Sequence, residues 1–248
     1  MPAVRRIGVA DVRLALSRGV EDFLAVPTQL LFLGLIYPLV GLVAARAAWG
    51  GRLLPLLFPM VAGLSLMGPA AALGIYELSR RREAGEEPSW LDAFSVLRSP
   101  AIGAIAALGV ILALIFVAWL YAAHAIYVAT IGPMAPPSVG HFARTVLETP
   151  EGWRLIVFGN LAGFGFALVV LALTVVSFPL LLDRNTSLAT AIRTSLRACA
   201  VNPGPMALWG LTVAALLLLG CLPAFVGLAV VMPVLGHATW HLYRRVVE

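Results

Sequence analysis

Apolar residues gather into runs that are long enough to cross a membrane. A transmembrane helix needs about 20 consecutive apolar residues. Four runs meet this requirement, at residues 26–45, 53–76, 101–130 and 155–182. A fifth run, residues 205–240, would be about 54 Å long as one helix, which exceeds a hydrocarbon core of about 30 Å. It contains GCLPA, whose Gly and Pro favour a break, so we predict two spans there, at 205–220 and 223–240, and six spans in all.

The arginine residues orient these spans, because the cytoplasmic connections of membrane proteins are enriched in positive charge. With the N-terminus inside, thirteen of the seventeen Arg residues fall in cytoplasmic segments: Arg5, Arg6, Arg13, Arg18, Arg80, Arg81, Arg82, Arg98, Arg184, Arg193, Arg197, Arg244 and Arg245. The outer segments hold the other four: Arg46, Arg52, Arg144 and Arg154. The distribution predicts that both termini are cytoplasmic and that residues 131–152 form an outer loop.

Composition agrees with a membrane protein. The chain is 61% hydrophobic and 12% charged, whereas a soluble domain carries about 25% charged residues. We therefore expect an all-α polytopic protein with one membrane domain, residues 1–248. The Arg residues flank the spans and form no basic face, which argues against a nucleic-acid partner. The sequence has no Lys, which is typical of a GC-rich bacterial genome, and we expect the bacterial inner membrane as its location.

The segment before the first span has the pattern of an amphipathic helix at residues 8–22, on the cytoplasmic surface. Apolar residues recur every three or four positions, at Val9, Val12, Leu16, Val20 and Phe23. Asp11, Arg18 and Asp22 fall on another face. Such a helix suits the membrane interface.

A weak internal repeat accompanies this helix. ALSRGVEDFLAVP (15–27) and AIRTSLRACAVNP (191–203) both place Pro twelve positions after Ala, and AFSVLRSP (93–100) is a shortened version. Each precedes an odd-numbered span. The pattern fits three parallel units, each an interfacial helix followed by a two-span hairpin. It also fits unrelated cytoplasmic connections, which tend to be amphipathic and to end in Pro.

The even-numbered spans end in polar residues, which three parallel units would bring together. This candidate inner polar collar consists of Tyr76, Glu77, Arg80, Asp183, Arg184, His237, His241, Tyr243 and Arg244. Acidic groups at an apolar boundary are costly unless they are paired, and a nearby Arg is the obvious partner. A collar of salt bridges that locks the bundle is one interpretation. A binding site that faces the cytoplasm and simple solvated helix ends are the alternatives.

His237 and His241 are four residues apart, so a helix places both imidazoles on one face. A closed metal site needs about four ligands. Glu77 and Asp183 would complete the set, but each has an Arg nearby that repels a cation. We therefore expect no metal there, and we expect the pair to anchor a helix end at the interface through lipid headgroups or salt bridges.

Three further features concern the spans and the outer loop. Ser138 is placed to cap a short helix that Pro150 would end, either as a lid or as a loop lying on the bundle. The second span alternates Pro and Gly, which predicts a kinked helix. GNLAGFGF in the fourth span (159–166) carries small residues four apart, which allow close packing of helices within the bundle or in a homodimer.

At AALGIYELSRRREAGE, VSFPLLLDR, NPGPMALWG and VVMPVLGHATWHLYRR the chain resembles an uncharacterised bacterial family of integral membrane proteins, domain of unknown function 2189. The resemblance extends over about residues 10–247. It implies a six-span inner-membrane protein with no established activity. Some members carry a label that relates them to cytochrome c oxidase subunit I. The four His residues of this chain are too few for that haem–copper centre, and His124 and His141 are predicted at the opposite side of the membrane from His237 and His241.

The residue patterns identify no reaction. The sequence contains no recognisable nucleophile with its base, no paired carboxylate site and no phosphate loop, and the third and fourth spans carry no charged residue. We therefore expect no catalytic residues and no cofactor. The leading hypothesis is a non-enzymatic accessory, assembly or scaffold subunit that contacts the lipid bilayer and other integral membrane proteins or a second copy. The alternative is a transporter or channel for a small or lipid-like molecule, which would need a deep polar cavity between the spans.

Overall fold

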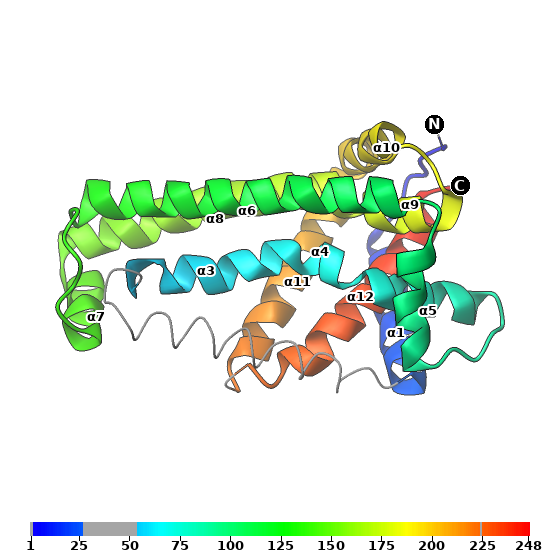
Figure 1. Cartoon of the computed structure of the whole chain (residues 1–248), viewed down its shortest axis with the longest axis horizontal. Coiled ribbons are helices and arrows are strands. Elements are labelled where there is room, and N and C mark those ends of the chain that lie inside the picture. Colours follow the sequence, from blue (N-terminus) through cyan, green and yellow to red (C-terminus); the bar gives the residue numbers. More distant parts are fainter. Residues whose placement is uncertain (1, 27–53, 224) are drawn as a thin grey trace. The chain divides into compact units, whose positions relative to one another are not determined.

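The computed structural model describes residues 2–26, 54–223 and 225–248 (Figure 1). This part of the chain is all-helical and contains no strand, which confirms the predicted all-α class. Apart from Val26, the predicted first span lies outside the described residues. The chain divides into two compact units. The described residues of unit 1 are 2–26, 68–110, 170–223 and 225–248, and those of unit 2 are 54–67 and 111–169.

The described residues form α-helices and 3₁₀ helices. In chain order they are α1 (Val9–Ala25), η1 (Leu54–Leu56), α3 (Leu57–Leu64), η2 (Ser65–Met67), α4 (Gly68–Ala71), α5 (Leu73–Glu83), η3 (Trp90–Arg98), α6 (Ile102–Thr130), α7 (Val139–Glu148), α8 (Pro150–Thr174), α9 (Ser177–Arg184), α10 (Leu188–Val201), α11 (Pro203–Cys221) and α12 (Leu228–Val246). The elements labelled η are 3₁₀ helices.

Four helical stretches in the described part are long and apolar enough to cross a membrane. They are Leu54–Glu83, Ile102–Thr130, Pro150–Arg184 and Pro203–Cys221. The second to fifth predicted spans fall on these stretches. The predicted sixth span, 223–240, falls on α12, whose C-terminal half carries the polar residues of GHATWHLYRR.

Two of the stretches are interrupted where proline weakens the helix. Between Leu54 and Glu83 the chain forms five short helices, with Pro59 and Pro69 among their residues, so the predicted kink is confirmed. The stretch from Pro150 breaks after Thr174 and resumes as α9. Pro179 explains this second break, because a proline ring clashes with the carbonyl four residues earlier.

In unit 1, α1 packs closely against α12. The buried residues of α1 are Val12, Ala15, Gly19 and Asp22. A Cβ atom on Gly19 would lie 2.6 Å from the Cβ of Ala238, so only glycine permits this approach. Val9 and Val20 of the predicted apolar face are exposed, whereas Asp22 of the predicted polar face is buried. Small residues, and not the largest apolar ones, select the face that meets α12.

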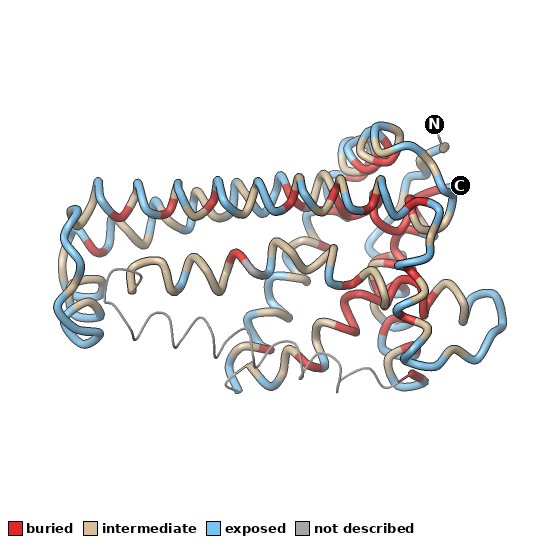
Figure 2. The backbone as a smooth tube through the Cα atoms, viewed as in Figure 1, coloured by how far each residue is buried: buried red, intermediate tan, exposed pale blue. Residues whose placement is uncertain are grey.

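The other two stretches of the internal repeat are helical as well, and each packs within unit 1. The helix η3 packs on α5, where a Cβ on Gly74 would lie 2.8 Å from the Cβ of Ala93. The helix α10 packs on α9, and Ser195 Oγ accepts a hydrogen bond from the backbone N–H of Val176 at 3.3 Å. The helices α5, α9 and α12 also contact one another. Figure 2 shows that buried residues gather along them.

Backbone hydrogen bonds join the two ends of the chain. The N–H of Arg5 donates to the carbonyl of Val246 at 2.8 Å, and the N–H of Glu248 donates to the carbonyl of Ala3 at 3.1 Å. Asn202, at the end of α10, accepts from the N–H of Ile7 at 2.8 Å and donates to the carbonyl of Arg5 at 3.0 Å. These hydrogen bonds hold the two ends of the chain side by side.

In unit 2, Trp119 of α6 organises the packing. Its indole N–H donates to the carbonyl of Pro59 at 2.8 Å, and its ring lies edge-on to Phe166 of α8, with centroids 5.6 Å apart. The helix α7 begins as predicted, because the Ser138 side chain accepts from the N–H of His141. The ring of Phe142 in α7 meets Tyr127 of α6, at 6.3 Å between centroids. This contact places α7 against the span and not away from it.

The contact between α1 and α12 predicts an unusual result for Gly19→Ala. In an exposed helix interior, replacing Gly by Ala stabilises by about 1 kcal/mol. At Gly19 the added methyl group would collide with Ala238, and overpacking costs about 1–3 kcal/mol. We expect Gly19→Ala to lower the unfolding temperature in detergent. The matched control is Gly109→Ala in α6, where a Cβ would meet nothing within 4 Å and stability should hold or rise. Equal stability of the two variants would contradict the packing described.

Candidate functional site

Charged and polar side chains from three helices meet inside unit 1, and we call this group the Asp22 cluster. It contains Asp22 of α1, Ser79 and Arg82 of α5, and His237 and His241 of α12. The spacings of three residues in α5 and four in α12 place each pair on one helix face. Asp22, Ser79 and His237 are buried, and His241 is 9% exposed.

The carboxylate of Asp22 accepts three hydrogen bonds. Its Oδ2 atom accepts from His241 Nε2 at 2.8 Å and from Ser79 Oγ at 2.7 Å, and its Oδ1 atom accepts from Arg82 Nε at 2.8 Å. Ser79 Oγ also lies 2.7 Å from Nδ1 of His237. Because Ser79 gives its proton to Asp22, we infer that His237 carries its proton on Nδ1 and donates to Ser79. The chain of donors therefore converges on one carboxylate.

This arrangement leaves one nitrogen atom of His237 without a partner. Nε2 of His237 is buried and has no hydrogen-bond partner among the described residues. With the proton on Nδ1, Nε2 carries a lone pair and no N–H, so no buried donor is left unsatisfied. A protonated imidazole would bury an unpaired N–H here, which is costly. The cluster therefore favours a neutral His237.

The three donors keep Asp22 ionised. Burial opposes ionisation, but the hydrogen bonds from His241, Ser79 and Arg82 outweigh burial and lower the pKa of Asp22 to about 2. A lowered folded-state pKa contributes stability above the ordinary pKa of about 4 for Asp. That contribution is lost as the pH falls from about 4 through about 2. At neutral pH the cluster thus holds a carboxylate anion beside one guanidinium.

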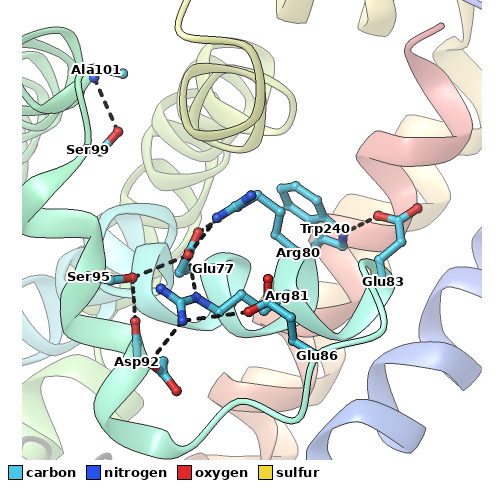
Figure 3. A network of polar contacts seen from close by, with 10 residues as sticks. All are labelled: Glu77, Arg80, Arg81, Glu83, Glu86, Asp92, Ser95, Ser99, Ala101 and Trp240. Carbon is cyan, nitrogen blue, oxygen red and sulfur yellow. Dashed lines mark hydrogen bonds and ion pairs between the residues drawn. The ribbon is translucent and has the colours of Figure 1, made fainter.

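A second group, the Glu77 cluster, joins α5 to η3 (Figure 3). Glu77 accepts from Arg80 at 2.7 and 2.8 Å and from Arg81 Nε at 2.8 Å. Arg81 also donates to Asp92 of η3 at 3.0 Å, and Ser95 donates to Glu77 at 3.3 Å. The carboxylate of Glu77 is almost wholly buried, with 4% of its side chain exposed, while Arg80 is 41% exposed. The guanidinium groups therefore cover Glu77 from solvent.

A third group, the Asp183 cluster, joins α9, α5 and α12. The hydroxyl of Tyr243 donates to Asp183 Oδ2 at 2.5 Å. The same oxygen lies 3.6 Å from Arg184 Nε and 3.5 Å from Arg244 Nη1. Arg244 Nε donates to Glu83 of α5 at 3.0 Å. Asp183 is 19% exposed and Arg244 is 39% exposed on their side chains, so these ion pairs are partly hydrated.

The predicted collar residues thus divide among three clusters. Glu77 and Asp183 each meet arginine side chains, but the two histidines lie at Asp22 and not at either of these acids. Tyr76 is buried in α5 and belongs to none of the three clusters. The residues that the sequence reasoning missed are Asp22, Ser79 and Arg82. One signal in the sequence could have identified Asp22. The small residues Ala15 and Gly19 are four positions apart, and Asp22 follows three positions after Gly19, so all three lie on one face of α1.

The geometry of the Asp22 cluster is suited to holding helices and not to hydrolysis. A serine beside a histidine and an aspartate has the composition of a catalytic triad. Here Ser79 is fully buried and its hydroxyl donates to Asp22, so the oxygen is neither reachable nor activated by His237. Among the described residues, no group of three or more His, Cys, Asp or Glu side chains is arranged to bind a metal ion.

Asp22→Asn tests the cluster. The variant removes the anion while Arg82 stays, and losing hydrogen bonds to a charged group typically costs about 1–3 kcal/mol. We expect a lower unfolding temperature at pH 7 in detergent, and a difference from the wild type that shrinks as the pH falls from about 4 toward about 2. The control is Glu21→Gln, an exposed neighbour on the same helix. Equal losses in both variants, or a loss in Asp22→Asn that persists unchanged at low pH, would argue against a buried anionic clamp.

Comparison with known proteins gives one match. The model of a family described as predicted integral membrane protein, domain of unknown function 2189, matches residues 57–183, which is about half of the chain. This match confirms the resemblance seen in the sequence. No curated protein and no solved structure matches the chain. The chain therefore belongs to this family of integral membrane proteins, whose apolar helices contact the lipid bilayer.

Proposed function

We propose that the protein is a non-enzymatic scaffold or accessory subunit of the bacterial inner membrane, with six spans and both termini in the cytoplasm. The sixth span is α12, and the first is the apolar run at 26–45. Two observations support an even number of spans: the hydrogen bonds that join the termini and the excess of Arg in the segments assigned to the cytoplasm.

Helix contacts within unit 1 support three parallel units. Each interfacial helix packs on an even-numbered span end of the preceding unit in cyclic order: α1 on α12, η3 on α5, and α10 on α9. The first and third interfacial helices also share their register. Four pairs of equivalent positions are buried in both: Ala15 and Ala191, Gly19 and Ser195, Asp22 and Ala198, Val26 and Asn202.

The observation that supports the scaffold role most directly is the exposed amide of Asn160. Asn160 lies in α8 about 9 Å further along the helix than Arg154, at 1.5 Å per residue, and its side chain is exposed. Its amide donates to the carbonyl of Ile156 at 2.7 Å, which leaves a second N–H and the carbonyl oxygen available. In a bilayer, such a side chain hydrogen-bonds to a neighbouring helix.

The residues around Asn160 fit this contact. Val157, Phe164 and Leu168 are 50%, 62% and 47% exposed. Val157 lies three residues before Asn160, and Phe164 and Leu168 lie four and eight residues after it, so all four residues share one face of α8. The face is apolar apart from the amide. It would pack against a transmembrane helix of another membrane protein or of a second copy.

The alternative function, a transporter or channel for a small or lipid-like molecule, needs a polar path between the spans. In the Asp22 cluster the polar groups bind one another. The cavity beside His241 measures about 20 Å³, which is room for about one water molecule. The scaffold role therefore agrees better with the described residues.

Replacing Asn160 tests the proposed contact. Asn160→Leu should weaken association with partner helices up to about tenfold, because an interhelical hydrogen bond contributes at most about 1–2 kcal/mol. The measurement is quantitative identification of proteins that copurify from native membranes in mild detergent. Thr212→Val in α11 is the matched control, since Thr212 also bonds to its own helix. An unchanged set of partners and an unchanged oligomeric state in Asn160→Leu would refute the role.

Cysteine accessibility tests the topology. After replacement of Cys199 and Cys221, a cysteine at Ser138 should react with a membrane-impermeant reagent added outside intact cells. A cysteine at Glu86 should react only after the cells are opened. Both positions are exposed, so burial would not explain a difference. The reverse pattern would overturn the proposed orientation.

A further inference from the structure

A groove runs between α6 and α8 in unit 2. Its volume is about 610 Å³, which lies in the range of sites for small molecules, about 300–1,000 Å³. Its lining consists of Ile126, Ala129 and Thr130 of α6 and of Arg154, Phe158, Leu161 and Ala162 of α8. Apart from Arg154 and the Thr130 hydroxyl, the lining side chains are apolar. That hydroxyl already donates to the carbonyl of Ile126.

The side chains explain why the helices leave a groove at this level. Further along both helices, the rings of Trp119 and Phe166 fill the space between α6 and α8. In the groove, Ala129 and Ala162 present only methyl groups. Large aromatic rings thus set the separation of the helices, and small residues beyond them leave the space unfilled.

The position of the groove corresponds to one leaflet of a bilayer. From Arg154 to Ala162 it extends about 12 Å along α8, which is close to half of a hydrocarbon core of about 30 Å. Arg154 stands at the end of the groove nearest the start of α8, beside Trp153, which is 56% exposed. Trp and Arg are residues of the membrane interface. A bilayer placed by these two residues would hold the apolar walls at acyl-chain depth and the guanidinium at headgroup depth.

The guanidinium of Arg154 is available for a ligand. Its side chain is 63% exposed, and its one ion pair among the described residues is with Glu151, at 4.0 Å. Glu151 is itself 48% exposed, and exposed pairs of this kind contribute little energy. A guanidinium binds a phosphate through two parallel hydrogen bonds.

We propose that this groove is a binding site for one membrane glycerophospholipid. An acyl chain lies along the apolar walls between Ala129 and Ala162, and the phosphate binds Arg154. The charge of the guanidinium and the apolar lining together require a ligand with both parts. A phospholipid of the surrounding leaflet supplies them.

The site is tested by native mass spectrometry of the purified full chain in detergent, with added lipid. The probes are phosphatidylglycerol, phosphatidylcholine and diacylglycerol with identical acyl chains. We expect one tightly held molecule of either phospholipid and at least about tenfold weaker binding of diacylglycerol, because a hydrogen bond to a charged group is worth about tenfold or more. Equal binding of diacylglycerol would refute the contact between Arg154 and the phosphate.

Two variants, each with a matched control, locate the site. Arg154→Gln should lose about tenfold in phospholipid affinity, while Arg144→Gln in α7, which does not line the groove, should keep the wild-type affinity. Ala162→Phe should fill the groove and lose the bound molecule. Ala167→Phe, at an exposed position on the same helix, should retain it. Retention in both Arg154→Gln and Ala162→Phe, or equal loss in a variant and its control, would show that the lipid only coats the surface.

Discussion

Unit 1 depends on a single carboxylate that is held away from water. Asp22 lies on α1, but its donors His241, Ser79 and Arg82 come from α12 and α5. Burying a charge is costly unless it is paired and hydrogen-bonded, so the three helices can pack only in an arrangement that brings all three donors to the carboxylate. Gly19 makes this possible, because its missing side chain lets α12 approach α1 closely enough. Gly19 and Asp22, both on α1, thus specify the same contact with α12.

Much of the fold followed from local composition. Long apolar runs predicted the four stretches that can span a membrane. Pro and Gly predicted the interruptions between Leu54 and Glu83, and Ser138 predicted the start of α7. These features depend on residues that are close in sequence, and for this reason the sequence alone predicted them. The break before α9 was missed although Pro179 marks it, because an uninterrupted apolar run conceals a change in helix direction.

The candidate site was predicted only where charge partners are close in sequence. Glu77 with Arg80, and Asp183 with Arg184, are such pairs. The contact of the histidines with Asp22 was not predicted, because Asp22 is 219 positions from His241 and helical periodicity placed it with Asp11 and Arg18 on the polar face of α1. The periodicity of large apolar residues is a poor guide when a helix packs through alanine and glycine. Tracing the small residues of α1 identifies the correct face.

The two units differ in whether their polar side chains find partners within the chain, and this difference is relevant to function. In unit 1 the carboxylates of Asp22, Glu77 and Asp183 find partners within the chain. In unit 2, Asn160 and Arg154 of α8 remain largely exposed beside apolar side chains. A polar group in a membrane is costly unless it is satisfied. The partners of Asn160 and Arg154 are then best sought among the molecules around the protein, an amide or hydroxyl of a neighbouring helix for one and a lipid phosphate for the other. Unit 1 is accordingly the part that holds its own helices in place, and α8 in unit 2 is the part whose chemistry calls for contacts with other molecules.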